Sequence, residues 1–188
     1  MIPISASIFG TTWLDLYAVG IAYAQHWKQP YHVGLKFGME DGPQIGFEAS
    51  YSKNGFIRFP FLEKSLQYRG YQNAMCGRTM RTIRLPISSN QIETLFIGCK
   101  RAVGTVERYP QKWRVVYKLL HQRRGWPMRN TPNIADCSEE VARRLFEIGI
   151  DLRDDKNDQF DELSPSEVWV NMTKKLEGEL SCFHVECL

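Results

Sequence analysis

The chain has 188 residues, of which 43% are hydrophobic and 24% are charged, and its formal net charge at neutral pH is +3. This composition predicts one globular domain with a sizeable core, without low-complexity segments or internal repeats. The longest apolar stretch, residues 13–24, is interrupted by Asp15 and is shorter than a bilayer requires, which argues against an integral membrane protein. No basic residue precedes it as in a signal peptide. We therefore expect the protein to be cytoplasmic in its producer, or to be exported by a signal-independent route.

From the N-terminus, the sequence predicts one helix among short strands. Strands are expected at residues 2–9, 31–37, 45–50 and 56–59. The helix is expected from residue 13 to about residue 27, because the Gln29-Pro30 pair that follows disfavours the helical conformation. The Asn54-Gly55 pair predicts a tight turn before the last of these strands.

Beyond residue 60 the pattern changes mainly to helices. Residues 63–82 are expected to form a loop-rich linker that leads into a strand at 82–85. Helices are expected after the cap residue Ser88 or Ser89, at 113–121, from Cys137 to Gly149 and from Pro165 onward, with a last strand at 180–185.

The five cysteines and four histidines are scattered along the chain. The cysteines are odd in number and lack the close paired spacing of a zinc site, which favours reduced thiols in a compartment where disulfides are uncommon. No His-Glu-x-x-His pattern is present. We therefore expect no metal and no cofactor.

Cys137 is the first candidate for chemistry. It stands in Asp136-Cys137-Ser138-Glu139, where a loop turns into an amphipathic helix. The unpaired backbone N–H groups and the positive dipole end at a helix start favour the thiolate, which is the nucleophilic form. Most cysteines are inert and buried, but the polar neighbours on both sides favour a nucleophile here.

His32 is the candidate base. If its strand and the following strand pair about a turn near Glu40, His32 lies opposite Glu48, and both point away from the apolar face of the sheet. Glu48 would then hold the imidazole by a hydrogen bond. A register shift of one residue would move Glu48 to the other face. A structural histidine and a solvated glutamate are the alternatives.

Three motifs follow one another along the chain: Tyr31-His32-Val33-Gly34-Leu35, Gly46-Phe47-Glu48-Ala49 and Cys137-Ser138-Glu139-Glu140-Val141-Ala142. In this order they resemble the circularly permuted NlpC-like branch of the papain-like cysteine hydrolases, in which the histidine strand precedes the nucleophile helix. The resemblance covers roughly residues 2–61 and 130–175. It implies an α+β, papain-like fold in a single domain, residues 1–188, with a central antiparallel sheet packed against the nucleophile helix. Residues 63–130 have no match and are expected to be a family-specific insertion that forms a cleft wall.

The same resemblance implies a mechanism. Cys137 matches the nucleophile, His32 the general base, and Glu48 the residue that orients the imidazole. The implied reaction is hydrolysis of an amide bond, most often in the stem peptides of peptidoglycan. Because no signal peptide is visible, we expect an antibacterial effector delivered to a target-cell periplasm, or a phage lysin. An immunity protein or a secretion apparatus would then be its partner.

Other functions stay open. Related permuted folds act on lipids as acyl hydrolases or acyltransferases, which would require an apolar cleft, for example one lined by Trp13, Tyr17 and Trp126. A binding protein that kept the fold without turnover is a further alternative. The basic stretch at 100–129, with its interleaved aromatic residues, is expected to be a solvated face balanced by the acidic loop after Asp151, and not a nucleic-acid site.

Overall fold

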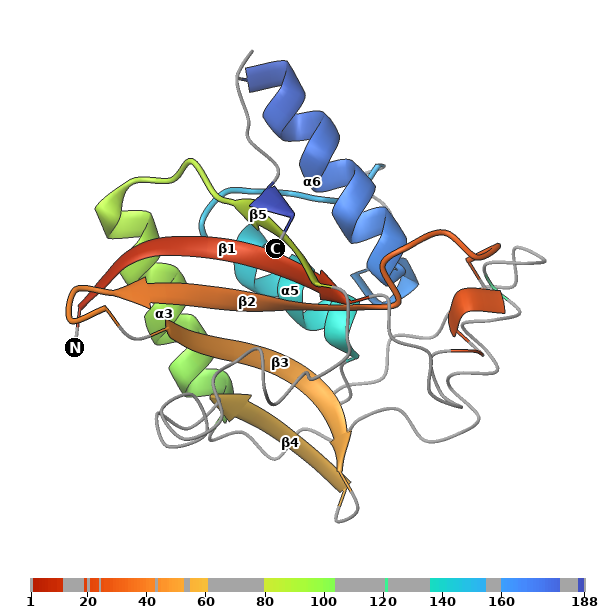
Figure 1. The fold of residues 1–188 in the computed structure, drawn as a ribbon, viewed down its shortest axis with the longest axis horizontal. Helices are drawn as coiled ribbons and strands as arrows, with labels where there is room; N and C mark the ends of the chain where they lie inside the picture. The colour runs from red at the N-terminus through yellow and green to blue at the C-terminus, as the bar shows by residue number, and fades with distance from the viewer. Residues whose placement is uncertain are drawn as a thin grey trace.

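The computed structural model describes residues 2–11, 19, 21–23, 25–42, 44–52, 55–60, 80–103, 121, 136–154, 160–179 and 186–187. Over these residues the fold is α+β (Figure 1). Its strands are β1 (Pro3–Thr11), β2 (His32–Met39), β3 (Gln44–Ser52), β4 (Gly55–Pro60), β5 (Met80–Arg84) and β6 (Glu186–Cys187). Its helices are α3 (Ser89–Val103), α5 (Cys137–Phe146) and α6 (Pro165–Glu179), with a 3₁₀ turn at Phe160–Glu162.

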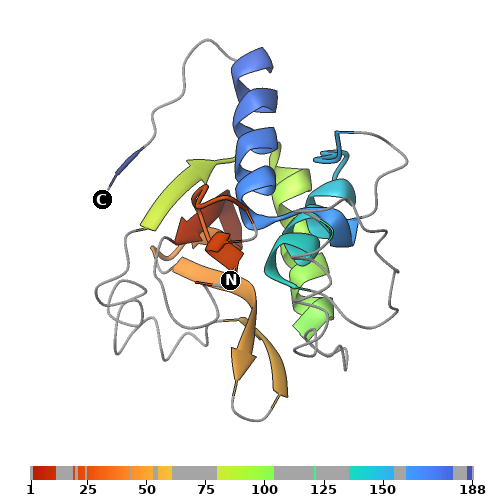
Figure 2. The same cartoon turned by 90° about the vertical axis from the view of Figure 1, so that its right-hand side faces the viewer.

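The strands form one antiparallel sheet in the order β4-β3-β2-β1-β5-β6. Figure 2 shows α3, α5 and α6 together on one side of this sheet. Alternate residues of β2 face these helices: Val33, Leu35 and Phe37 all lie in the buried core. Phe37 packs edge-on against Phe96 of α3, with ring centroids 5.2 Å apart. Burying one side chain of this kind contributes about 1.5–3 kcal/mol. The alternation places several such side chains on one face of β2, and their burial holds the helices against that face.

The hairpin between β2 and β3 turns at a glycine. Gly38 pairs with Gln44, and the Gly42 N–H donates to the Met39 carbonyl oxygen over 3.0 Å. Gly42 has a φ of +85°, a left-handed conformation that glycine adopts without steric cost. The turn is therefore centred near Asp41.

This turn corrects the predicted register. The last pair that β2 and β3 form toward the site is Leu35 with Phe47. Continued by one residue, it places Glu48 opposite Gly34 and not opposite His32. The predicted register was wrong by two residues because the turn is centred one residue later than Glu40. Since the error is an even number, His32 and Glu48 still belong to the same face.

Two helix starts carry reciprocal side-chain caps, which explains why they were visible in the sequence. Before α6, the Ser164 hydroxyl accepts from the Glu167 N–H (3.3 Å), and the Glu167 carboxylate accepts from the Ser164 N–H (2.7 Å). Ser88 and Gln91 make the same pair of bonds before α3. Each arrangement is a capping box, and the predicted helix starts there are confirmed.

Several sequence predictions fall outside the described residues. Of the predicted first helix, residues 19 and 21–23 are helical and residues 25–27 form a turn, while His121 is the one described residue of the predicted helix at 113–121. The strand predicted at 180–185 is not described, and the structure has β6 directly after it. Within residues 63–130, β5 joins the central sheet and α3 packs against its core. The cleft wall predicted for the rest of that segment stays a prediction.

Candidate active site

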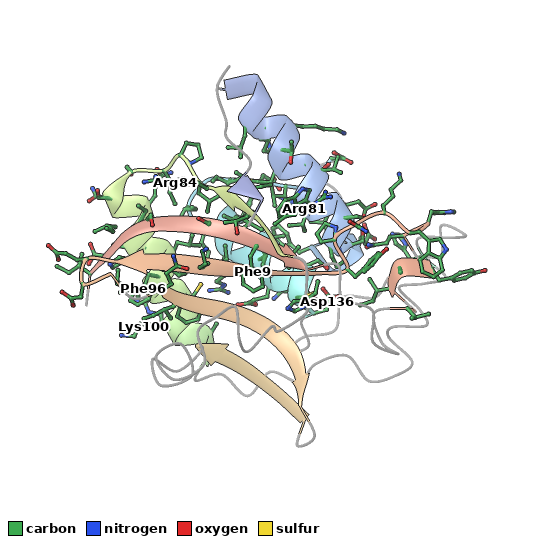
Figure 3. The ribbon with its side chains drawn as sticks, in the orientation of Figure 1. Phe9, Arg81, Arg84, Phe96, Lys100 and Asp136 are labelled. Atoms are coloured by element: carbon green, nitrogen blue, oxygen red, sulfur yellow. The ribbon has the colours of Figure 1, made fainter. Side chains whose placement is uncertain are left out.

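Cys137 is the first residue of α5, as predicted. Its N-cap is Asp136, whose Oδ1 accepts from the Glu139 N–H over 3.0 Å. Asp136 is seen toward the end of the sheet where β2 begins (Figure 3). Cys137 itself is only 2% exposed and belongs to the same buried cluster as Val33 and Leu35. The sequence predicted a polar setting for this thiol, whereas the structure gives it polar sequence neighbours and a largely apolar contact surface.

Ser138 ties the start of α5 to the segment before α6. Its hydroxyl oxygen lies 2.7 Å from the Leu163 carbonyl oxygen, which can only accept, and 2.7 Å from Asp136 Oδ1. The residue is fully buried. A buried hydroxyl with two close oxygen neighbours fixes the backbone on either side of it, so Ser138 locks the helix turn that carries Cys137.

Gln25 ties α6 to the segment that enters β2. Its Oε1 accepts from the Ser166 N–H (3.4 Å), and its Nε2 donates to the carbonyl oxygens of Pro30 (2.7 Å) and Lys28. The Gln25 side chain is buried and satisfied on both its oxygen and its nitrogen. Pro30 precedes His32 by two residues. The Gln25 amide therefore connects the start of β2 to α6, which lies in the same helical layer as the α5 helix that carries Cys137.

His32 is the first residue of β2 and pairs with Thr11 of β1. Strand alternation places it on the opposite face from Val33, which faces the helices. His32 shares its face with Phe9: the two ring centroids are 6.2 Å apart and the rings are tilted by 55°. The imidazole is partly buried.

Cys137 and His32 therefore lie at the same end of the sheet, on elements that contact each other, but on different faces. A direct contact between sulfur and imidazole requires the backbone at the start of β2 to change, because the backbone of a strand sets the face to which each side chain points. Glu48 lies in β3, where it pairs with Phe59 of β4, and its side chain is outside the described residues. Its role as the residue that orients His32 stays a prediction.

Buried charges surround the start of α5. Glu139 is fully buried and pairs with Arg143 over 2.6 Å, and Glu140 pairs with Arg144 over 3.2 Å. Acidic residues in the first turn and basic residues in the last turn complement the helix dipole. Removing one partner would leave a buried or half-buried charge unpaired, so these pairs help to hold α5 in place.

No role was predicted for Phe9, Gln25 or Ser138. Ser138 stood within a motif that was recognised, but its hydroxyl partner lies 25 positions away. Gln25 accepts a hydrogen bond from Ser166, which lies 141 positions later in the chain. No local sequence pattern predicts such a contact. The three aromatic residues proposed for an apolar cleft, Trp13, Tyr17 and Trp126, lie outside the described residues.

No family model matches this chain, and no curated protein is significantly similar to it in sequence. Among the residues that the structure describes, no group of three or more histidine, cysteine, aspartate or glutamate side chains is placed to hold a metal ion. None of the helices in the described ranges is both long and apolar enough to cross a membrane.

Proposed function

We propose that this protein is a cysteine hydrolase of the permuted, NlpC-like class with a papain-like fold, in which Cys137 is the nucleophile and His32 the general base. One observation carries the proposal. Cys137 is the first residue of an N-capped helix, and that helix starts at the end of the sheet where His32 begins its strand. A thiol at a helix start and an imidazole from a distant strand are the two groups that this chemistry requires.

The reaction would be amide hydrolysis in two steps. The Cys137 thiolate attacks the carbonyl carbon, the C–N bond breaks, and the His32 imidazolium gives its proton to the departing amine. Water then attacks the acyl-enzyme with His32 as base and regenerates the thiol. The Cys137 N–H, in the first turn of α5, is free of an intrahelical acceptor and suits the developing oxyanion. Glu48 would fix the tautomer of His32.

The proposal makes a structural demand. With Cys137 2% exposed and His32 on the far face, substrate binding must open a path to the sulfur, and the backbone at the start of β2 must change so that the imidazole can reach it. His32 is the terminal residue of its strand, which leaves its side chain less confined than one in mid-strand. When this path opens, the Cys137 side chain loses contacts with its apolar neighbours. The acyl group of a bound substrate is expected to replace them.

Peptidoglycan stem peptides are the proposed substrate, because this is the class that the motif resemblance most often implies. An effector or lysin acting on them would be delivered by a signal-independent route, and an immunity protein would protect the producer. The direct test is to incubate the protein and its Cys137→Ala variant with muropeptides and read the products by mass. New amine and carboxylate ends from the wild type alone would support the proposal, and unchanged muropeptides would contradict it. A parallel incubation with phospholipids distinguishes acyl-ester chemistry.

The burial of Cys137 favours a second candidate, a binding protein that does not turn over substrate. Cys99, in the middle of α3 and 3% exposed, is a matched internal reference. At neutral pH an activated Cys137 should react with iodoacetamide much faster than Cys99, and His32→Ala should remove the difference. Equal rates, measured by peptide mass mapping, would favour the non-catalytic protein.

A further inference from the structure

A row of apolar side chains is exposed just before the histidine strand. Val19, Tyr23 and Trp27 follow one another at intervals of four residues and are 42%, 56% and 54% exposed. We refer to them as the Val19–Trp27 row. Figure 1 shows the helical turn at residues 21–23 at the end of the molecule where β2 begins. Val19 and Tyr23 lie one helical turn apart, and Trp27 follows just beyond the end of that turn. Single exposed apolar residues are ordinary, but three within nine residues of chain favour a contact surface.

The row is not the core-facing side of its segment. Ala22 and Tyr31 are buried against each other, with Ile21 packed beside them. The side of the turn that faces the protein is thus already satisfied, and the Val19–Trp27 row is an additional apolar surface. A segment at the protein surface needs apolar residues only on the side that faces the core. The second apolar side of this segment is therefore not explained by packing within the protein.

The backbone holds Trp27 outward in an uncommon conformation. The helical turn ends with two hydrogen bonds, from the His26 N–H to the Tyr23 carbonyl (3.3 Å) and from the Trp27 N–H to the Ala22 carbonyl (2.6 Å). This is the Schellman pattern, which usually has glycine at the position of His26. His26 and Trp27 both have positive φ, 54° and 61°. This conformation is uncommon for residues other than glycine, and strained residues of this kind cluster at functional sites such as ligand clamps.

Buried contacts impose this conformation. Gln25, which directly precedes the exposed tip, bonds to the carbonyl oxygens of Lys28 and Pro30, which follow it. The Tyr31 hydroxyl donates to the Trp27 carbonyl oxygen over 3.5 Å. These hydrogen bonds fix the backbone at His26 and Trp27, so that the exposed Trp27 side chain is carried by an ordered turn.

The charge of the sequence on either side of the row favours an anionic surface. From residue 16 to residue 39 the sequence contains no aspartate or glutamate, and the exposed His26 and Lys28 flank Trp27. Tyrosine and tryptophan have an apolar body and a polar tip, which suits them to the headgroup layer of a bilayer, and a neighbouring lysine adds attraction to anionic lipid. We propose that the Val19–Trp27 row docks the protein on an anionic membrane surface, with Trp27 and Tyr23 inserted at headgroup depth.

This proposal is independent of the catalytic one. Trp27 precedes His32 by five residues. Docking would therefore hold the end of the sheet that begins with His32 close to the lipid headgroups, whether or not Cys137 reacts.

The test is co-sedimentation of the full chain with vesicles of phosphatidylglycerol and phosphatidylcholine in equal amounts, and with vesicles of phosphatidylcholine alone. We expect binding to the anionic vesicles, and the double variant Tyr23→Ser/Trp27→Ala should bind roughly tenfold more weakly. Lys28→Gln should weaken binding only where phosphatidylglycerol is present. The matched control is Val170→Ser on α6, which is 41% exposed and should bind as the wild type does.

Wild type that stays in the supernatant with anionic vesicles would overturn the proposal. Equal binding of the double variant would do so too, as would equal losses in Val170→Ser. A dimer in analytical ultracentrifugation that is lost in the double variant would assign the row to a second copy of the chain instead. If the double variant does not fold, Trp27→Phe allows a second measurement: bromine-labelled lipid should quench wild-type fluorescence more than that of Trp27→Phe. Equal quenching contradicts insertion.

Discussion

The ring of Phe9 lies across Gly34 and beside the ring of His32. A Cβ on Gly34 would come within 2.3 Å of the Phe9 Cζ, and the Phe9 and His32 centroids are 6.2 Å apart. Phe9 is fully buried on this face. The absence of a side chain at Gly34 is thus what lets a large ring reach the candidate base from the neighbouring strand.

Gly34→Ala should destabilise the protein by about 1–3 kcal/mol, because the new methyl group meets the buried Phe9 ring and the Phe47 carbonyl oxygen, neither of which has room to move. Urea denaturation measures the change. The control is Gly38→Ala in the same strand, whose methyl group would meet only the Ser5 side chain and should cost less than about 1 kcal/mol. Equal costs at the two glycines would contradict the packing described for Phe9.

Ser138→Ala should destabilise the protein by about 1–3 kcal/mol, because it leaves the buried Leu163 carbonyl oxygen without its donor. Under the proposed function, alkylation of Cys137 should also lose its rate advantage over Cys99, since the turn that carries the thiol is no longer fixed. Ser166→Ala is the control: its hydroxyl makes a longer contact, 3.2 Å to Ser164, and its loss should cost less. A Ser138→Ala protein of wild-type stability would show that this tie is not needed.

His26→Gly should stabilise the protein by about 1 kcal/mol, because glycine relieves the positive φ of 54° without removing a buried contact. A thermal melt checks this, and a rise in Tm is expected. In Lys28→Gly, where the backbone is not left-handed, the same substitution should lower Tm or leave it unchanged. A fall in Tm for His26→Gly would mean that the imidazole contributes more than the conformation costs.

Asp151→Asn should lower stability at neutral pH and have little effect in acid. The hydrogen bond from the Arg153 side chain holds the pKa of the Asp151 carboxyl below its usual value. A carboxylate with a depressed folded-state pKa contributes stability above its unfolded pKa of about 3.9, and that contribution is lost as the pH falls through the folded value. Because Asp151 is partly exposed, the contribution should be only a few tenths to about 1 kcal/mol.

The measurement is urea denaturation of wild type and Asp151→Asn at neutral pH and at successive pH values below 4. The stability difference between them should shrink toward the acid end. Arg153→Ala should cost more than Asp151→Asn at neutral pH, since the guanidinium also stacks on Phe146 and Phe160 at 5.1 and 4.6 Å. A difference that grows in acid would contradict the direction of the pKa shift.

Local signals were enough to place most of the described elements. Two-residue alternation located β2 and β3, and the predicted strands there are confirmed. A cap residue located the start of α3, Pro165 that of α6, and the change from loop to amphipathic pattern that of α5. The predicted end of the helix at Gly149 was three residues too late: α5 ends at Phe146, and Gly149, with a φ of +90°, closes the turn that follows. Such signals are readable because each depends on residues within a few positions of one another.

The register of the hairpin was not readable in the same way. A turn centred on Glu40 and one centred on Asp41 both agree with the alternation. They change the β3 partner of each β2 residue by two positions, which leaves every side chain on the same face. The observed turn depends on the left-handed backbone of Gly42. The pattern of apolar residues gives no information about this backbone conformation.

By itself, the sequence determined the α+β composition, the position of Cys137 at a helix start and that of His32 at the start of a strand, because each follows from periodicity and capping. Only the tertiary structure decided the surroundings of these two residues. The burial of the thiol, the separation of Cys137 and His32 onto different faces and the hydrogen bonds of Gln25 and Ser138 all depend on contacts between distant segments. The physical reason is that side-chain direction alternates locally, whereas burial depends on which parts of the chain pack together.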